Sequence, residues 1–121
     1  MRDFKDLEVW KKSIDLAERI YIVTKKFPSD EKYGLISQLR RAIISVSSNI
    51  AEGCGRRTSK NFVGFLYNAF GSVKEIESQL MISYRLKYIE KNIYDELVNE
   101  LDSIGKMLRS FIDYVSRRNV K

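Results

Sequence analysis

The sequence predicts an all-α protein: an up-down-up-down antiparallel four-helix bundle that forms a single domain over residues 1–121. Two observations carry this prediction. Apolar residues recur at spacings of three and four along four long segments, which is the pattern of amphipathic helices. The chain of 121 residues has one proline and six glycines, so few residues interrupt these segments. Long helices joined by short loops favour antiparallel neighbours, and a chain of this length can bury a core without disulfides or metals.

Four helices are expected, over residues 7–26, 29–52, 59–87 and 92–117. Pro28 separates the first two, because proline lacks a backbone N–H and is favoured in the first turn of a helix. Gly53 ends the second helix. Thr58 or Ser59 is suited to cap the third helix and Asn92 the fourth, because their side-chain oxygens accept hydrogen bonds from free backbone N–H groups. Each of the last three helices carries one apolar seam that we expect to face the core.

The first helix differs from the others because it carries two apolar stripes, about 100° apart around its axis. One stripe consists of Leu7, Trp10, Ile14, Ala17, Tyr21 and Thr24. The other consists of Val9, Leu16, Ile20, Val23 and Phe27. One stripe suffices for a bundle core, so the second indicates either a broad core or a contact with another subunit. We expect Val9, Leu16, Ile20 and Val23 to form an oligomer interface.

The second helix carries an unusual polar face with little net charge, formed by Arg41, Ser45, Asn49 and Glu52. We expect these side chains to be largely buried and bonded to one another, or to the third helix through Ser72 or Glu75. A guanidinium can satisfy several oxygens on a neighbouring helix or subunit, which favours a structural role for Arg41 over a nucleic-acid contact. If all of these residues proved exposed and unpaired, a ligand-facing role would be favoured instead.

Positive charge is expected to gather at one end of the bundle. The chain has 22 Lys and Arg against 16 Asp and Glu, a net charge of +6. The up-down topology brings together the start of the first helix, the loop after the second and the end of the fourth. The basic residues at this pole are Arg2, Lys5, Lys11, Lys12, Arg56, Arg57, Lys60, Arg117, Arg118 and Lys121. A one-ended positive field attracts polyanions, although charged chain ends can also be merely solvated.

Within this pole, five residues are the candidates for binding phosphate: Arg56, Arg57, Lys60, Arg117 and Arg118. The first three lie in or beside a glycine-containing loop, which gives them access to a ligand. Four tyrosines can offer stacking surfaces for bases, namely Tyr84, Tyr88, Tyr94 and Tyr114. Aromatic residues at helical spacing more often serve packing or subunit contact.

No catalytic or metal site is expected. The chain contains no histidine, which excludes Ser-His and Cys-His nucleophile pairs and the Glu-x-x-His motifs of di-iron bundles. Cys54 stands alone, so neither a zinc site nor an internal disulfide can be built from cysteines. Arg56 and Arg57 favour a lowered thiol pKa at Cys54. The chain offers neither a resolving cysteine nor a base, however, so we interpret Cys54 as a small side chain that fills space in the loop. We expect no enzyme activity and no cofactor.

The composition also favours a cytoplasmic protein. A single cysteine agrees with a reducing compartment. The charged N-terminal residues are not followed by the apolar stretch of a signal peptide, and no apolar run approaches the length of a membrane span. We therefore expect no membrane partner.

Several motifs resemble one known family. They are the stretch from Leu35 to Gly53, which ends in Asn-Ile-Ala-Glu-Gly, the opening Asp6-Leu-Glu-Val-Trp10, the Phe27-Pro28 break, and the stretch from Ala69 to Glu77. Together they resemble the four-helix-bundle proteins encoded in bacterial 23S rRNA intervening sequences. Such proteins are similar to the accessory protein of diversity-generating retroelements, a basic bundle that forms a pentameric barrel and binds nucleic acid and a reverse transcriptase. The resemblance implies a homopentamer and nucleic-acid binding.

Two hypotheses of function follow. The first is a homo-oligomeric bundle, expected to be a pentamer, that binds RNA or DNA, or a nucleic-acid-handling protein, through its basic pole. The second is a protein-interaction scaffold or adaptor, in which the charge is incidental and nucleic acid is not bound directly. Binding to nucleic acid measured against salt distinguishes them, because phosphate contacts weaken steeply as salt rises.

Overall fold

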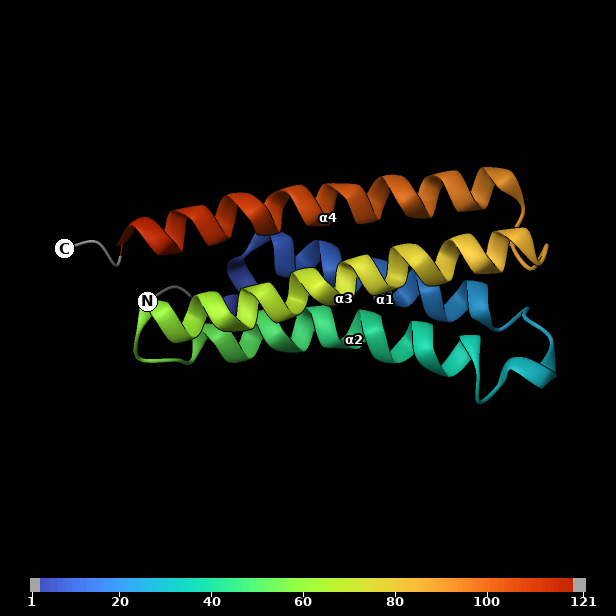
Figure 1. Cartoon of the computed structure of the whole chain (residues 1–121), viewed down its shortest axis with the longest axis horizontal. Helices are drawn as coiled ribbons and strands as arrows, with labels where there is room; N and C mark the ends of the chain where they lie inside the picture. The colour runs from blue at the N-terminus through green and yellow to red at the C-terminus, as the bar shows by residue number, and fades with distance from the viewer. Residues whose placement is uncertain (1–2, 119–121) are drawn as a thin grey trace.

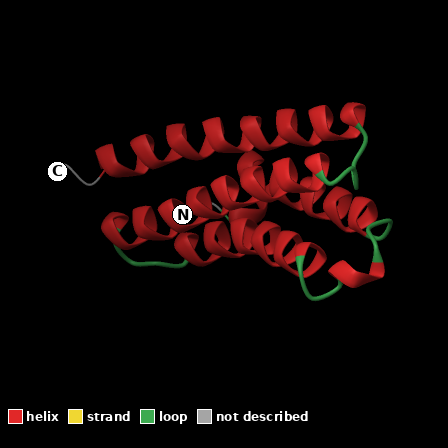
Figure 2. Cartoon of the chain, turned by 45° about the vertical axis from the view of Figure 1, so that its right-hand side comes forward, coloured by secondary structure: helices red, strands yellow, loops and turns green. Residues whose placement is uncertain are grey.

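The computed structural model describes residues 3–118, which form four long α-helices and two short 3₁₀ helices, with no strand in that range (Figure 2). The α-helices are α1 (Glu8–Thr24), α2 (Leu35–Cys54), α3 (Ser59–Arg85) and α4 (Lys91–Arg118). The 3₁₀ helices are η1 (Phe4–Asp6), before α1, and η2 (Ser29–Glu31), between α1 and α2. No helix in the described part of the chain is long and apolar enough to cross a membrane.

The four helices run alternately up and down, and each lies beside the next along its length (Figure 1). The start of α1, the α2–α3 loop and the end of α4 lie at the left-hand end in that view. The η2 segment and the α3–α4 connection lie at the other end. The predicted four-helix bundle is therefore confirmed. The most extensive helix–helix contact joins α2 to α3, and the least extensive joins α1 to α4.

The core is built from the apolar seams that the sequence indicates for the last three helices, together with one stripe of α1. Residues spaced by three and four along a helix lie on one face, so each seam turns inward as a unit. The most completely buried large side chains are Leu16, Ile20, Leu39, Ile43, Ile50, Leu66, Ile76, Leu80, Leu97, Leu101, Ile104 and Leu108. Each such side chain contributes about 1.5–3 kcal/mol by leaving water, which makes this seam the main source of stability.

The stripe of the first helix that was expected at an oligomer interface lies in the core of the single chain. Val9, Leu16 and Ile20 are 4%, 0% and 1% exposed and belong to the core of the single chain. Val23 is partly buried against the same core. The assignment of this stripe to an oligomer interface is therefore wrong. Both stripes of α1 follow a helical period, and only the positions of α2 and α4 decide which one turns inward.

The second helix begins later than predicted, at Leu35 rather than at residue 29. Pro28 starts only the short η2 turn, and Gly34 then separates η2 from α2 with an irregular backbone (φ −110°, ψ −114°). The carboxylate of Glu31 accepts a hydrogen bond from the backbone N–H of Leu35 at 3.1 Å. This acceptor satisfies one of the free N–H groups of the first turn, and so it helps fix the start of the helix.

The ends of α3 are closed by local hydrogen bonds. At its start the Thr58 hydroxyl accepts a hydrogen bond from the N–H of Asn61 at 3.1 Å, which confirms Thr58 as the cap. At its end the N–H of Tyr88 bonds to the carbonyl of Ser83 and the N–H of Lys87 to that of Tyr84, both at 2.9 Å. This is the Schellman arrangement, and it places Lys87 in the left-handed region at φ 67°.

Candidate nucleic-acid interface

The basic pole is the end of the bundle formed by the start of α1, the α2–α3 loop and the end of α4. Arg56 and Arg57 lie in the loop, Lys60 lies in the first turn of α3, and Arg117 and Arg118 lie in the last turn of α4. All five side chains are exposed. The structure thus brings the five sequence-predicted phosphate ligands to one end. Two other residues counted at this pole, Arg2 and Lys121, lie outside the described residues.

Several cations of the pole have no acidic partner among residues 3–118. Arg56 lies 3.6 Å from Glu52, and its guanidinium also covers the Phe65 ring at 4.5 Å. Within residues 3–118, neither Arg57, Lys60 nor Arg117 takes part in an ion pair. Because ion pairs between exposed side chains are weak and screened by salt, even Arg56 remains available to a phosphate.

Lys5 and Lys11 at the start of the chain are partly offset by acidic neighbours. Lys5 lies 3.9 Å from Asp3, and Lys11 lies 3.7 Å from Glu8. The positive field of the pole therefore comes mainly from the α2–α3 loop and from the end of α4.

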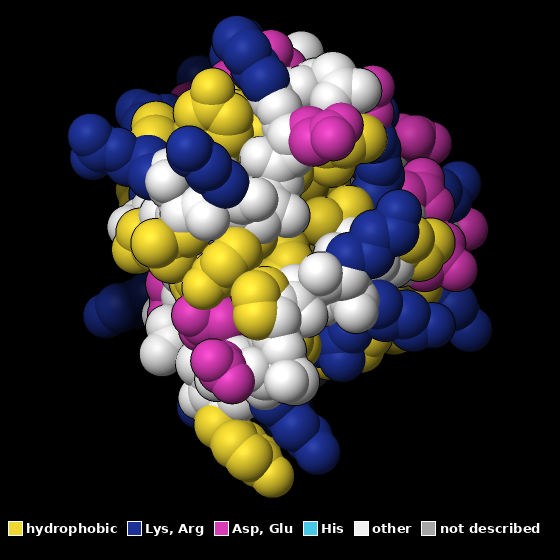
Figure 3. Space-filling model, turned by 90° about the vertical axis from the view of Figure 1, so that its right-hand side faces the viewer, with side chains coloured by type: hydrophobic (Ala, Val, Ile, Leu, Met, Phe, Trp, Pro, Cys, Tyr) yellow, Lys and Arg dark blue, Asp and Glu magenta, His cyan; other side chains and the backbone are white. Residues whose placement is uncertain are grey.

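The opposite pole mixes the two signs of charge, and Figure 3 shows Lys and Arg side chains interspersed with Asp and Glu on this end. Lys91 pairs with Asp95 at 2.9 Å, and this hydrogen bond raises the pKa of Lys91. The Tyr88 hydroxyl donates a hydrogen bond to Glu31 at 3.0 Å, which raises the pKa of Tyr88. Cations and anions therefore lie close together at this end, and one of its lysines is directly paired with an aspartate.

Only two of the four residues on the polar face of α2 are half-buried and hydrogen-bonded. The Ser72 hydroxyl of α3 donates to the Ser45 hydroxyl at 3.0 Å, and the Asn49 amide donates to the same hydroxyl at 3.0 Å. Both residues of α2 are half-buried, and they bond to each other and to Ser72 as expected. In contrast, Arg41 and Glu52 are exposed, so the expected burial of these two charged side chains is wrong. Glu75, the alternative partner on α3, is also exposed and forms no bond to this face within residues 3–118. A charged side chain is costly to bury unless hydrogen bonds or an opposite charge satisfy it fully. The hydroxyl and amide groups of this face are too few to do so for a guanidinium or a carboxylate.

The arginine that helps hold the bundle together is Arg40, which precedes Arg41. Its guanidinium donates to the Thr24 hydroxyl at 2.9 Å and to the Tyr21 carbonyl at 3.2 Å, and it lies 4.4 Å from the centre of the Tyr21 ring. These contacts close the carbonyl end of α1 against α2, where a positive charge is favourable. The structural role expected of Arg41 therefore belongs to its neighbour, because adjacent residues point about 100° apart on a helix.

Cys54 closes α2 beside the pole and is partly buried. Burial raises the pKa of its thiol, and the negative charge of Asp3 raises it further. The prediction that Arg56 and Arg57 lower the pKa of this thiol is therefore wrong, because both side chains are exposed to solvent. The thiol stays protonated at neutral pH, which agrees with its interpretation as a small filler. The described residues contain no group of acidic or sulfur ligands suited to hold a metal ion.

Three of the four tyrosines expected to stack on bases are already occupied. The rings of Tyr84 and Tyr94 stack on each other with centres 4.7 Å apart, and Tyr88 packs against Phe27 at 5.3 Å. Tyr114 is 56% exposed, but it lies between Phe111 at 6.5 Å and Arg118 at 5.6 Å. Tyr67 on α3, which the sequence did not single out, is 59% exposed, and within residues 3–118 no aromatic ring or cation lies against it.

An apolar strip remains open on the α1–α2 side of the bundle. We define the apolar strip as Trp10, Ile14, Ala17 and Tyr21 of α1 with Ile44 of α2. The four residues of α1 are half-buried, and Ile44 is 43% exposed. Because Arg40 contacts Tyr21 and the two helices are antiparallel, Ile44 lies one turn further along, beside Ala17. The residues of the apolar strip on α1 all belong to the first stripe of that helix.

The seam between α1 and α4 is hollow at one end. A groove of about 750 Å³ is lined by apolar residues, including Ile22 and Ile93, and by charges of both signs. Arg19 crosses the seam and pairs with Glu96 and, at 2.6 Å, with Glu100, and these carboxylates raise its pKa. The groove contains no convergent set of acid, base or nucleophile, so we assign it no chemistry.

Comparison with known proteins agrees with this architecture. A family model described as 23S rRNA-intervening sequence protein matches residues 5–110, from η1 into α4. The chain belongs to this family. The match to the intervening-sequence family confirms the resemblance of the Leu35–Gly53 stretch and the other motifs. No curated protein sequence was found to match the chain.

A solved structure is also similar to this intervening-sequence protein. It is that of a protein of unknown function from the S23 ribosomal protein family of Bacteroides thetaiotaomicron. The two are 28% identical, the match covers 87% of this chain and 95% of that one, and the TM-score is 0.81. The similarity therefore extends over nearly the whole bundle.

Proposed function

We propose that this protein is a non-enzymatic, cytoplasmic nucleic-acid-binding bundle that assembles as a homo-oligomer, with a pentamer as the expected form. Its ligand is RNA or DNA, alone or with a nucleic-acid-handling protein. The observation that carries the proposal is the cluster of exposed cations at the basic pole, several of them without an acidic partner in residues 3–118. No cofactor and no membrane take part.

The geometry of the pole supports phosphate binding over simple solvation. Arg57 and Lys60 lie on either side of the Thr58 cap, so the loop and the first turn of α3 present both charges together. Arg117 and Arg118 add positive charge from α4 at the same end. Cations that gather on one surface and are not neutralised locally raise the concentration of a polyanion there, whereas the mixed charges of the opposite pole do not.

Replacing Arg56, Arg57 and Lys60 together with Ala is expected to weaken nucleic-acid binding and to reduce its dependence on salt. Each lost phosphate contact lowers the slope of log affinity against log salt by about 0.7 for single strands or 0.9 for duplex. Fluorescence anisotropy with labelled RNA and DNA, measured from low to physiological salt, gives both quantities. The thermal midpoint should hardly change, because exposed charges contribute little to folding.

The matched control replaces three exposed lysines of the opposite pole, Lys25, Lys26 and Lys32, with Ala. It removes the same charge from the molecule and should weaken binding less. Equal losses in the two variants would mean that only net charge matters and would contradict a site at the basic pole. In an oligomer the difference should grow, because several copies of the pole act on one strand.

The apolar strip supports the assembly part of the proposal. Its residues on α1 lie along one side of that helix, and among the described residues Ile14 and Tyr21 do not belong to the set that packs against the core. A row of half-buried apolar side chains beside exposed Ile44 is the kind of surface that a second subunit covers.

Replacing Ile14 with Glu is expected to dissociate the oligomer and leave the helices folded. A carboxylate placed in a subunit contact loses its hydration without gaining a partner, whereas in the free chain it faces solvent. Light scattering reports the mass and circular dichroism the helix content. The control is Ile22→Glu, a change at a residue that is 61% exposed and lines the α1–α4 groove, and it should preserve the mass. An unchanged mass for Ile14→Glu would contradict this interface.

The apolar strip also supports a second candidate function, a protein-interaction scaffold without a direct nucleic-acid role. In that case the strip recruits a different protein, and the charge of the pole is incidental. Absence of binding to RNA and DNA at low salt would favour the scaffold over the nucleic-acid-binding bundle.

A further inference from the structure

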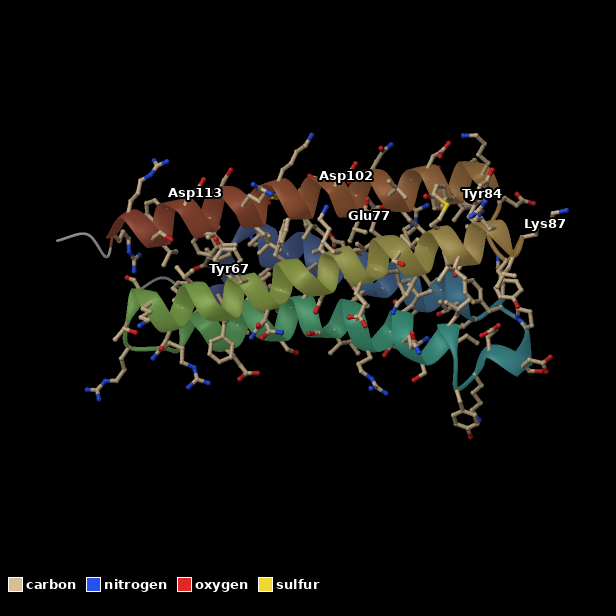
Figure 4. The ribbon with its side chains drawn as sticks, viewed as in Figure 1. Tyr67, Glu77, Tyr84, Lys87, Asp102 and Asp113 are labelled. Atoms are coloured by element: carbon tan, nitrogen blue, oxygen red, sulfur yellow. The ribbon has the colours of Figure 1, made fainter. Side chains whose placement is uncertain are left out.

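Tyr67 differs from the four tyrosines expected to stack on bases because, in the described part of the chain, its exposed ring is not paired with another aromatic ring or a cation. It lies in the third turn of α3, counted from the basic pole, and is 59% exposed. Within residues 3–118 no aromatic ring stacks on it and no cation covers it. Figure 4 shows it on the same side of the bundle as Asp113 of α4, in the half that ends at the basic pole. The large aromatic side chain of Tyr67 is therefore exposed to solvent near the proposed phosphate-binding surface.

Tyr67 also forms one wall of a small hollow between α3 and α4, of about 130 Å³. Phe70, Arg109, Ile112 and Asp113 complete its lining. The guanidinium of Arg109 lies 5.6 Å from the centre of the Phe70 ring. Flat aromatic and guanidinium surfaces are the ones on which nucleobases stack. Because Arg109 and Asp113 carry opposite charges, the hollow suits a neutral base better than a phosphate.

Positive charges lie on both sides of Tyr67 along α3. Lys60 and Lys74 are each seven residues away, which on a helix is nearly the same face and about 10 Å in distance. Lys60 belongs to the basic pole, and in the described part of the chain it forms no ion pair. Lys74 pairs with Glu77 at 3.3 Å in an exposed contact. A strand that follows these lysines passes the ring of Tyr67 between its phosphate contacts.

Access to the ring is open along the helix. Gly64 and Gly71 lie one turn before and one turn after Tyr67, and both are exposed. A Cβ built at either position would meet nothing within 4 Å. The positions that would otherwise place side chains beside the ring therefore leave it clear for a planar ligand.

We propose that the hollow at Tyr67 is a stacking site for an unpaired nucleobase, so that this protein prefers single-stranded RNA or DNA to duplex. The inference rests on the proposed nucleic-acid binding and specifies the form of the ligand. In a duplex the bases are stacked on one another and cannot reach the ring, whereas in a single strand every base has a free face. The cations of the pole hold the phosphates of either form, and Tyr67 distinguishes them.

The experiment compares Tyr67→Ala with the wild-type protein on two labelled probes, an unstructured single strand of about 16 nucleotides and a duplex of the same length. Tyr67→Ala should weaken binding to the single strand by at least about fivefold and change binding to the duplex by less than about twofold. Tyr67→Phe, which keeps the ring, should behave as wild type. The control is Tyr33→Ala, a change to a residue that is 87% exposed and lies near the opposite pole.

Three results would overturn the stacking site while the protein still binds nucleic acid through its pole. They are an unchanged affinity for the single strand, an equal loss on the single strand and the duplex, and a change in oligomer mass on replacing Tyr67, which would make this face a subunit contact. Failure of the proposed function is a different result. In that case the wild-type protein binds neither probe at low salt, and the stacking site fails with it.

Discussion

Replacing Ile20 with Glu is expected to unfold the chain at room temperature. Ile20 is 1% exposed and lies within the core among the inward residues of α1. The change removes a large apolar side chain and places a carboxylate where no partner can satisfy it. The expected cost exceeds about 5 kcal/mol, which is comparable to the whole stability of a small domain. Circular dichroism and urea titration measure the loss of helix and of cooperative unfolding.

The same substitution elsewhere on α1 serves as the control. Ile22→Glu, at a residue that is 61% exposed, and Ile14→Glu, on the apolar strip, should both leave a cooperatively folded chain. A folded Ile20→Glu variant that only dissociates would restore the original assignment of this stripe to an oligomer interface. It would also contradict the packing of α1 described here.

Replacing Gly53 with Leu is expected to destabilise the bundle by about 3 kcal/mol, because the added side chain overpacks the core. Gly53 is buried in the last turn of α2. A Cβ at this position would lie 2.8 Å from Cδ1 of Phe62 and 3.1 Å from Cβ of Phe65. Phe62 is itself 3% exposed and is held edge-to-face against Phe111, so its ring has no room to withdraw. Differential scanning calorimetry should show a midpoint lower by about 10 °C.

Gly64→Leu provides a matched comparison, with the same change in a helix but in open space. Gly is less favourable than Ala in a helix by roughly 0.8–1.0 kcal/mol, and Leu ranks close to Ala, so this variant should be as stable as wild type or more so. Equal effects at the two glycines would mean that helix propensity rather than the contact with Phe62 governs Gly53. The glycine of the Asn-Ile-Ala-Glu-Gly motif would then lack the packing role assigned to it.

Much of the architecture follows from local patterns. In α2, α3 and α4 a single apolar seam runs along each helix, so there is one way to turn each of them toward a core. Pro28 and the Gly53–Thr58 segment mark where the chain reverses, and the up-down order then places the α2–α3 loop at the same end as the start of α1 and the end of α4. For this reason the basic pole, including Arg57 and Arg117, could be located before any coordinates were known.

The parts that the sequence left undecided depend on how helices are rotated against one another. Ile14 and Ile20 both belong to regular stripes of α1, and only the placement of α2 and α4 puts Ile20 in the core. Arg40 and Arg41 are equivalent in the sequence, yet Arg40 meets Thr24 and Tyr21 while Arg41 faces solvent. Periodicity fixes which residues share a face, whereas the direction of that face is set by contacts between helices distant in the chain. The accessible ring of Tyr67 and its hollow with Arg109 are likewise decided by tertiary structure alone.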